Sequence, residues 1–251
     1  MIKKRIRVTI SLIFIAPVFV VLAIIAMALG HLLNFMHLRR ASEKTVHFLL
    51  DILVWWIFIC LGMHLHIEGK ENIPAWGKKV CYIANHQSMI DIPVLYGSGM
   101  WCGLVAKQEL FRIPLLHGLL KILKCVAIDR SSLRASLQSI LKGVEQIKQG
   151  YPMGIFPEGT RSKTGEIAEM KAGAFKMATK PGALVVPVAM KNTRNTFEAA
   201  DSFRIVQVYV KIMEPVDTSV MSEEELKVLH TKIEEEIKEA YALLPGPYDK
   251  R

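Results

Sequence analysis

The feature that most constrains this fold is an uncharged apolar run over Val8–Gly30, close to the N-terminus. Its 23 residues would form about 35 Å of helix, enough to cross a bilayer core about 30 Å thick. Pro17 predicts a kink in that helix. A second apolar stretch, Val46–Ile67, is interrupted by Asp51. Its uninterrupted part, Ile52–Met63, gives only about 18 Å of helix, which is short for a span.

Basic residues lie on both sides of the first stretch. They are Lys3, Lys4, Arg5 and Arg7 before it, and Arg39, Arg40 and Lys44 between the two stretches. Two crossings would place one basic group on the outer face, against the positive-inside tendency. A hairpin in one leaflet keeps both groups near cytoplasmic headgroups, where anionic lipid attracts each charge by about 1 kcal/mol. We therefore favour a monotopic two-helix hairpin on the cytoplasmic face of the inner (plasma) membrane.

Two alternatives to that hairpin stay open. One or two true spans would account for the same apolar lengths. A cleaved secretory signal would account for the basic start and for Ala26-Met27-Ala28 as a cleavage site. The apolar run is long for a signal, and a second apolar stretch follows it, so the signal is the weaker alternative.

Composition narrows the class of partner. The formal charge is +9 and 51% of the residues are hydrophobic, with the apolar excess concentrated before residue 67. A basic surface suits nucleic acid, anionic lipid or a phosphorylated substrate. The chain has no zinc-finger spacing, RNA-binding signature or basic-region heptad, which argues against nucleic acid. The four cysteines form no C-x-x-C pair and indicate buried thiols in a reducing compartment.

Beyond residue 80, short apolar runs alternate with helical periods, which predicts an α/β fold. The expected strands are Val80–Ala84, Trp101–Val105, Cys125–Ile128, Met153–Phe156, Leu184–Met190 and Ile205–Met213. The expected helices are Ser132–Gln149 and Glu223–Tyr241, the second opened by a capping box of Ser222 and Glu225. We divide the chain into a membrane-associated hairpin (1–67), an α/β domain (68–244) and a C-terminal tail (245–251).

A histidine precedes a carboxylate by five residues in the segment 85–91, where the spacing pairs His86 with Asp91. A neutral imidazole can take the proton of an attacking alcohol, a contribution of about 10²–10⁴-fold. The carboxylate would orient the ring and stabilise the imidazolium. The pair can meet only if His86 lies in the turn after strand 80–84 and a helix begins at Ser88. The simpler interpretation also holds at this point: Ser88-x-x-Asp91 is a capping-box pattern, and His86 would then be a surface residue.

A second polar segment, 156–162, follows the strand that ends near Phe156. Gly159 permits a turn with positive φ that exposes backbone donors. Thr160 adds a hydroxyl, and Arg161 offers a planar fork suited to phosphate. The segment therefore predicts an anion-binding turn, although a polar turn with a solvated arginine fits the residues equally well.

These two motifs, in this order, resemble the glycerolipid acyltransferase family, and within it the 1-acylglycerol-3-phosphate acyltransferases. Two further blocks extend the resemblance over residues 85–190. They are Lys107-Gln108-Glu109-Leu110 followed by Asp129-Arg130, and Val185-Val186-Pro187-Val188-Ala189, with Lys171-Ala172-Gly173 between them. The resemblance implies a mixed central sheet flanked by helices. It also implies transfer of an acyl group from an acyl-ACP or acyl-CoA thioester to the sn-2 hydroxyl of lysophosphatidic acid, without metal or cofactor.

The same resemblance assigns expected roles to individual residues. His86 would be the general base and Asp91 its orienting acid. The acceptor phosphate would be bound by Lys107, Arg130, Thr160 and Arg161. Glu158 and Gly159 are also expected to be substrate-binding residues, and Glu158 would position either the acceptor or the motif itself. Other acceptors stay open: a different lysophospholipid, glycerol 3-phosphate or a lyso-aminolipid. So do two other classes, a non-catalytic lipid-binding membrane protein and a secreted hydrolase. His64 and His66 share a strand face, but no third metal ligand accompanies them.

Overall fold

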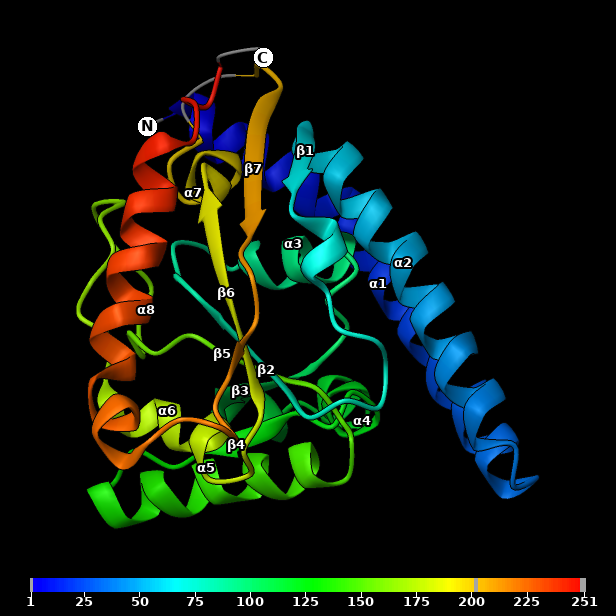
Figure 1. Cartoon of the computed structure of the whole chain (residues 1–251). Helices are drawn as coiled ribbons and strands as arrows, with labels where there is room; N and C mark the ends of the chain where they lie inside the picture. Colours follow the sequence, from blue (N-terminus) through cyan, green and yellow to red (C-terminus); the bar gives the residue numbers. More distant parts are fainter. Residues whose placement is uncertain (1, 201–202, 249–251) are drawn as a thin grey trace.

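A mixed sheet organises the chain, with the strand path β1-β7-β6-β2-β5-β3-β4 and with β8 paired to β6 (Figure 1). The computed structural model describes residues 2–200 and 203–248, so residues 249–251 of the expected C-terminal tail lie outside it. The strands are β1 (Met63–Glu68), β2 (Val80–Ala84), β3 (Gly103–Lys107), β4 (Val126–Ile128), β5 (Met153–Ile155), β6 (Leu184–Lys191), β7 (Val206–Ile212) and β8 (Val216–Asp217). The expected α/β class, with a mixed sheet flanked by helices, is confirmed.

The helices lie at both faces of this sheet and in the N-terminal hairpin (Figure 1). They are α1 (Ile2–Phe35), α2 (Arg39–Leu61), α3 (Asp91–Gly97), α4 (Pro114–Ile122), α5 (Leu133–Lys148), α6 (Ala172–Thr179), α7 (Thr193–Thr196) and α8 (Glu223–Leu243), with 3-10 turns η1 (Lys70–Asn72) and η2 (Gln108–Arg112). The predicted capping box is present, because the Ser222 and Glu225 side chains each bond the other's backbone N–H.

Because several neighbouring strands are parallel, their carboxyl ends lie at one edge of the sheet. β2, β5, β3 and β4 are neighbours and all parallel. β6 is parallel to β2 on its other side, whereas β7 runs antiparallel to β6. The register pairs Ile83 with Ile155, and Lys107 with Ile128. The segments that follow β2, β5, β3 and β4 therefore lie next to one another at the carboxyl edge of the sheet. Open α/β sheets bind their ligands at this edge.

Side chains alternate between two cores along the buried strands. On one face, Val185 and Ala189 of β6 pack with residues of α5, α6 and α8. On the other, Val186 and Val188 pack with residues of α2 and α3. Each large aliphatic side chain buried in these cores contributes about 1.5–3 kcal/mol. The sheet is thus fixed from both faces, which gives the edge loops a rigid support.

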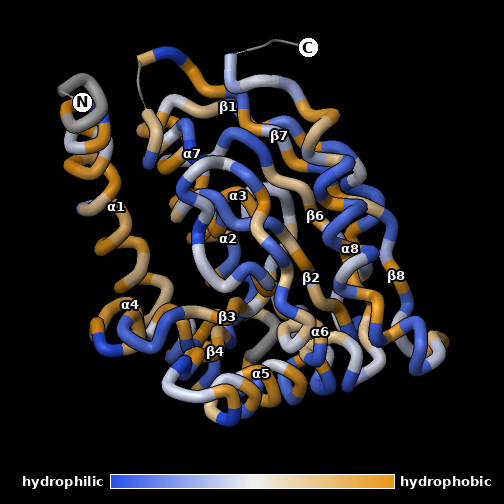
Figure 2. The backbone as a smooth tube through the Cα atoms, turned by 90° about the vertical axis from the view of Figure 1, so that its left-hand side faces the viewer, coloured by the Kyte–Doolittle hydropathy of each residue, from blue (hydrophilic) through white to orange (hydrophobic). Residues whose placement is uncertain are grey.

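The N-terminal hairpin extends beyond the sheet (Figure 1), and its tube is mostly hydrophobic along α1 (Figure 2). α1 continues as helix through Pro17. α2 has 23 residues and passes through Asp51, so it is longer than the short apolar part that the sequence indicated. By length and composition both helices could cross a membrane.

The second apolar stretch does not stay helical to Ile67. Gly62 ends α2 in the left-handed conformation, with φ 57°. Residues 63–67 then form most of β1, which pairs with β7. The physical reason is the period-two pattern of Met63, Leu65 and Ile67 with histidines between them, which suits a strand and not a helix. The part of the chain expected in the hairpin therefore reaches into the sheet.

Arg7, one of the basic residues that we expected near headgroups, is buried against the end of α2. Its guanidinium is buried and donates to the backbone carbonyl of Leu61, and to that of Arg204 over 3.4 Å. Leu61 is the last residue of α2, where the helix leaves carbonyls unpaired and carries partial negative charge. The Ser11 hydroxyl also donates to the Cys60 carbonyl, over 2.7 Å. α1 is thereby fixed to the end of α2.

Candidate active site

The two polar motifs follow adjacent parallel strands. His86 comes two residues after the end of β2, and Glu158 comes three residues after the end of β5. Neighbouring strands lie about 4.8 Å apart, and Ile83 of β2 pairs with Ile155 of β5. The two loops therefore meet at the carboxyl edge of the sheet.

His86 and Asp91 are in direct contact. The Nδ1 atom of His86 lies 2.7 Å from Oδ2 of Asp91, which is fully buried. The same oxygen accepts the backbone N–H groups of Gln87 (2.7 Å) and Ser88 (2.8 Å). Asp91 thus binds the backbone of the turn before α3 and also contacts the imidazole, whereas the capping box expected at Ser88 is not formed, because Ile90 is the N-cap residue and has no side-chain cap.

The helix begins later than the sequence predicts, at Asp91 and not at Ser88. The carboxylate of Asp91 binds the N–H groups of residues 87 and 88, which keeps this segment in a turn. His86 lies in that turn, after β2, as the geometry of the pair requires.

The ring of His86 is fixed on a second side by Phe156. The two rings stack with centroids 4.1 Å apart and planes 14° from parallel. Because a carboxylate can only accept, a neutral imidazole in this contact would donate from Nδ1 and leave Nε2 as an acceptor. The side chain is 18% exposed. A partly exposed, oriented Nε2 is the arrangement that a general base needs.

Glu158 holds the His86 loop and does not point into solvent. Its Oε1 accepts the backbone N–H of His86 over 2.5 Å, and its Oε2 accepts that of Ala168 over 3.0 Å. Burial raises the pKa of the Glu158 carboxyl, and the two N–H donors partly offset that rise. This carboxylate therefore joins the two motifs and the loop that follows them.

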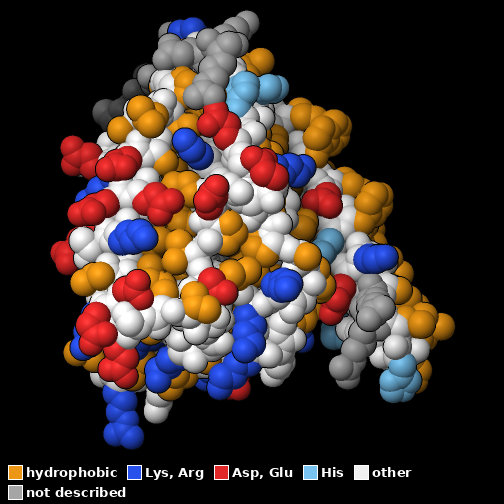
Figure 3. Space-filling view, in the orientation of Figure 1, with side chains coloured by type: hydrophobic (Ala, Val, Ile, Leu, Met, Phe, Trp, Pro, Cys, Tyr) orange, Lys and Arg blue, Asp and Glu red, His pale blue; other side chains and the backbone are white. Residues whose placement is uncertain are grey.

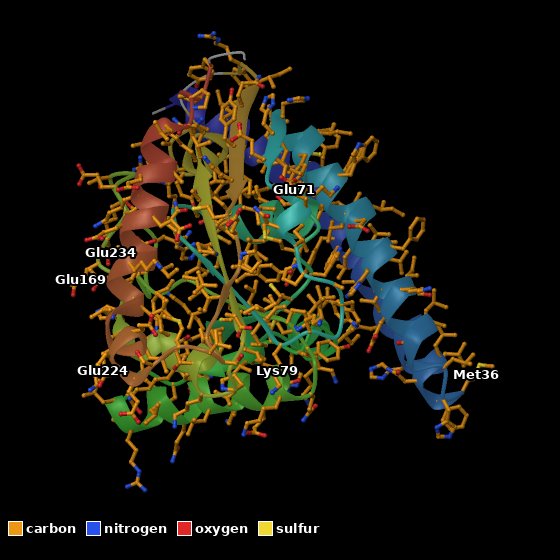
Figure 4. All side chains as sticks on the ribbon, in the orientation of Figure 1. Met36, Glu71, Lys79, Glu169, Glu224 and Glu234 are labelled. Carbon is orange, nitrogen blue, oxygen red and sulfur yellow. The ribbon has the colours of Figure 1, made fainter. Side chains whose placement is uncertain are left out.

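Further contacts complete that junction. The N–H of Ser162 donates to the carbonyl of His86 over 2.8 Å. The amide of Gln87 donates to the carbonyl of Gly165 over 2.7 Å. Farther along, the N–H of Met170 donates to Glu234 of α8 over 2.6 Å, at the side of the molecule where Figure 4 labels Glu169 and Glu234. The loop 156–171 is thus bound at several points to the sheet edge and to α8.

The expected phosphate-binding residues lie along the same edge. Lys107 ends β3, Arg130 follows β4, and Thr160 and Arg161 follow β5. Lys107, Arg130 and Thr160 are exposed. Gly159 has φ 75°, and a Cβ there would lie 3.2 Å from Nζ of Lys171. Lys171 is thus a further cation beside the turn, which the sequence offered only as part of a motif.

Glu198 was not recognised in the sequence. Its Oε1 accepts from Nη1 of Arg161 and from the backbone N–H of Met89, both over 2.9 Å. Its Oε2 accepts from the hydroxyl of Ser88 over 2.5 Å. It lies 110 residues from Ser88 and belongs to no motif, so only the fold brings it here.

His64 and His66 lie on β1, which is separated from β2 by β7 and β6 in the strand order. Nδ1 of His64 is 3.1 Å from Nε2 of His66, which also contacts Oε1 of Gln207 at 2.8 Å. In the part of the chain that the structure describes, no three His, Cys, Asp or Glu side chains come together as a metal site.

Comparison with known proteins places residues 64–191 in the family described as Acyltransferase, which covers about half of the chain. A 1-acyl-sn-glycerol-3-phosphate acyltransferase of Borreliella burgdorferi is 32% identical over 179 residues, covering 70% of this chain and 71% of that protein. A chloroplastic 1-acyl-sn-glycerol-3-phosphate acyltransferase of Arabidopsis thaliana is 32% identical over 170 residues, covering 68% of this chain but only 47% of that protein.

A solved structure extends the similarity to the whole chain. The crystal structure of the 1-acyl-sn-glycerophosphate (LPA) acyltransferase from Thermotoga maritima superposes with a TM-score of 0.79 at 28% identity. The match covers 98% of this chain and 100% of that one, so it includes the N-terminal hairpin.

Proposed function

This chain belongs to the acyltransferase family, and we propose that it transfers a fatty acyl group from a thioester to the sn-2 hydroxyl of 1-acylglycerol 3-phosphate, giving phosphatidic acid. The observation that carries this proposal is the contact of His86 with Asp91, in a loop bonded to the anion-binding turn. The names of the relatives support the acceptor.

In the proposed reaction, His86 acts as a general base through Nε2. It takes the proton of the acceptor hydroxyl as the oxygen attacks the thioester carbonyl, and Asp91 stabilises the imidazolium. The tetrahedral intermediate then collapses, the C–S bond breaks, and the thiol leaves with the proton from His86. A C–O ester bond forms and a C–S thioester bond is lost, so no acyl-enzyme is required. Backbone N–H groups or Lys107 would stabilise the oxyanion.

The acceptor's phosphate would bind along the sheet edge. Lys107, Arg130, Thr160 and Arg161 line this edge after three adjacent parallel strands. The strand spacing of about 4.8 Å places these segments within about 15 Å of one another, which long cationic side chains can bridge. Gly159 would present backbone donors, and Glu158 would hold the turn in place. The cationic side chains would form charge-assisted hydrogen bonds with the phosphate, and we therefore assign the acceptor to this edge of the sheet.

The hairpin would bring this site to the lipid from one leaflet. Hydrophobic side chains lie along its outer edge (Figure 3). Its other side is occupied by the domain, because α1 packs on α4 and α2 on α3. At the tip, where Figure 4 labels Met36, Phe35 is 83% exposed, and the basic residues of the sequence at positions 39, 40 and 44 come just after it. A tip pushed through the bilayer would carry these charges to the far side, whereas a hairpin lying along one leaflet buries the apolar side chains and keeps the charges with the cytoplasmic headgroups. We place this surface on the cytoplasmic side of the inner (plasma) membrane, where thioester donors are present.

The test is an acyl-transfer assay of the purified full chain on lipid vesicles, with both acyl-ACP and acyl-CoA as donors. We expect wild type to acylate lysophosphatidic acid and His86→Ala to lose turnover while keeping its fold and its vesicle binding. A near wild-type rate for His86→Ala would overturn the general-base assignment. An acceptor panel that includes another lysophospholipid, glycerol 3-phosphate and a lyso-aminolipid would reveal a different acceptor.

A further inference from the structure

Glu198 links the expected phosphate-binding cation to the loop of the expected base. Oε1 of Glu198 contacts Arg161, and Oε2 contacts the hydroxyl of Ser88. The N–H of Ser88 donates in turn to Asp91, which bonds His86. A series of hydrogen bonds therefore runs from the guanidinium of Arg161 to the imidazole of His86, through Glu198, Ser88 and Asp91.

Only part of Arg161 is engaged in this series. The bond to Glu198 uses Nη1, and the side chain is 42% exposed. A guanidinium has five N–H donors in a fixed fork, so a phosphate can bind the remaining edge while Glu198 holds Nη1. Glu198 is itself only 25% exposed, and the backbone N–H of Met89 fixes it further.

We propose that Glu198 is a positioning residue that sets the distance between the acceptor's phosphate and its reactive hydroxyl. This inference rests on the proposed function, because it assigns Arg161 to the phosphate and His86 to the hydroxyl. In a glycerol phosphate acceptor the two groups are separated by a fixed number of bonds. Holding Arg161 to the His86 loop makes the enzyme select a hydroxyl at that separation. Positioning of this kind lowers the entropy cost of reaching the reactive geometry.

The experiment measures binding of lysophosphatidic acid in mixed micelles without any donor, and turnover separately. Glu198→Gln keeps an oxygen for Met89 and Arg161 but removes the charge. We expect Glu198→Gln to weaken lysophosphatidic acid binding about threefold and to lower kcat, with the KM for the thioester unchanged. Binding of a monoacylglycerol without phosphate should not change.

A double-mutant cycle separates positioning from a structural role. Arg161→Ala removes the phosphate contact, so Glu198→Gln added to Arg161→Ala should weaken binding no further. If the two losses multiply, the inference fails. Glu198→Asp keeps the charge on a side chain one methylene shorter, and it should not restore wild-type binding. Glu145→Gln is the matched control, because Glu145 also forms an ion pair at 2.9 Å, with Lys148, on the exposed surface of α5.

The remaining outcomes are equally decisive. Tighter binding by Glu198→Gln would show that Glu198 competes with the phosphate, which overturns the inference. Unchanged binding and kcat would overturn it too. If wild type binds lysophosphatidic acid with the expected coupling of residues 161 and 198 but transfers no acyl group, the proposed function fails and the inference fails with it, whereas an active wild type in which the two losses multiply overturns the inference alone. If the wild type does not prefer the phosphate-bearing acceptor, both fail.

Discussion

The backbone N–H of His86 lies 2.5 Å from Oε1 of Glu158, so the two motifs are joined by a hydrogen bond between the loops of adjacent strands. The second oxygen of Glu158 binds the N–H of Ala168. One buried carboxylate thus fixes the position of the imidazole and of the loop that carries Arg161. Both Glu158 oxygens are therefore engaged by backbone donors of the site, so we expect Glu158 to hold these loops together.

Replacing Glu158 by Gln should therefore cost both stability and turnover. The amide retains one acceptor oxygen, and its NH₂ faces the other backbone N–H, which leaves a buried donor unpaired. The cost should be about 1–3 kcal/mol of unfolding free energy, measured by denaturant unfolding in detergent. The control is Glu166→Gln in the same loop, at an exposed side chain, which should change neither quantity. An unaltered unfolding free energy in Glu158→Gln would contradict the bracing role.

The unfolding free energy and the turnover should both depend on the protonation of Glu158. Burial raises the pKa of Glu158, so the folded chain takes up this proton at a higher pH than the unfolded chain. Between the two pKa values the native state binds more protons, so the contribution of Glu158 to the unfolding free energy falls as pH rises through that window. Turnover should rise as pH rises through the same window, because the protonated carboxyl at low pH loses an acceptor for the backbone N–H groups of the His86 loop and of Ala168. The measurement compares wild type with Glu158→Gln for both quantities across pH. Parallel profiles of the two proteins would refute this assignment.

Asp91 allows its two roles to be separated by two substitutions. Asp91→Asn keeps an oxygen for the three donors but loses the charge that stabilises the imidazolium. We expect kcat to fall by about 10²–10⁴-fold with a small change in Tm. Asp91→Ala leaves those donors without their acceptor in a fully buried position, so it should also destabilise the fold by about 1–3 kcal/mol. Full activity in Asp91→Asn would show that the carboxylate serves only the turn.

Gly159 should tolerate no side chain. Its φ of 75° is unfavourable for alanine, and the added Cβ would lie 3.2 Å from Nζ of Lys171. Gly159→Ala should cost about 1–2 kcal/mol in the turn and raise the KM for the phosphorylated acceptor. The matched control is Gly173→Ala in α6, where nothing lies within 4 Å and no positive φ is required. That control should be neutral or stabilising by up to about 1 kcal/mol. Equal effects at both glycines would argue against a special turn.

The hydrophobic periodicity of the sequence predicted strands and helices well in the segments where it was pronounced. The expected strand Val80–Ala84 agrees with β2, and the helix Ser132–Gln149 differs from α5 by one residue at each end. β1 was assigned to the hairpin because its apolar residues continue the composition of α2. α4, α6 and α7 are short, and each has too few turns for a clear helical period.

In the candidate site, contacts between residues close in the sequence could be predicted, and contacts between distant residues could not. His86 and Asp91 could be paired from spacing because five residues form one turn between a strand and a helix. Glu198 could not be found in this way, because a residue after β6 reaches Ser88 only through the order of strands in the sheet. The bond of Glu158 to His86 likewise depends on β2 and β5 being neighbours.

The hairpin topology can be tested at its tip. Met36 is 55% exposed between the two helices, and a fluorophore on Met36→Cys would report its depth in vesicles to which the protein is added from outside. In a monotopic hairpin that lies along the outer leaflet, the basic residues after Met36 keep the tip at the headgroups, so quenchers attached to the lipid near the headgroups and aqueous quenchers outside the vesicle should act on the label, and a quencher enclosed in the lumen should not. A label on Lys180→Cys, at an exposed position of the domain, should be quenched from outside only. Quenching of the label at the hairpin tip by a quencher enclosed in the vesicle lumen would show that the hairpin spans the bilayer.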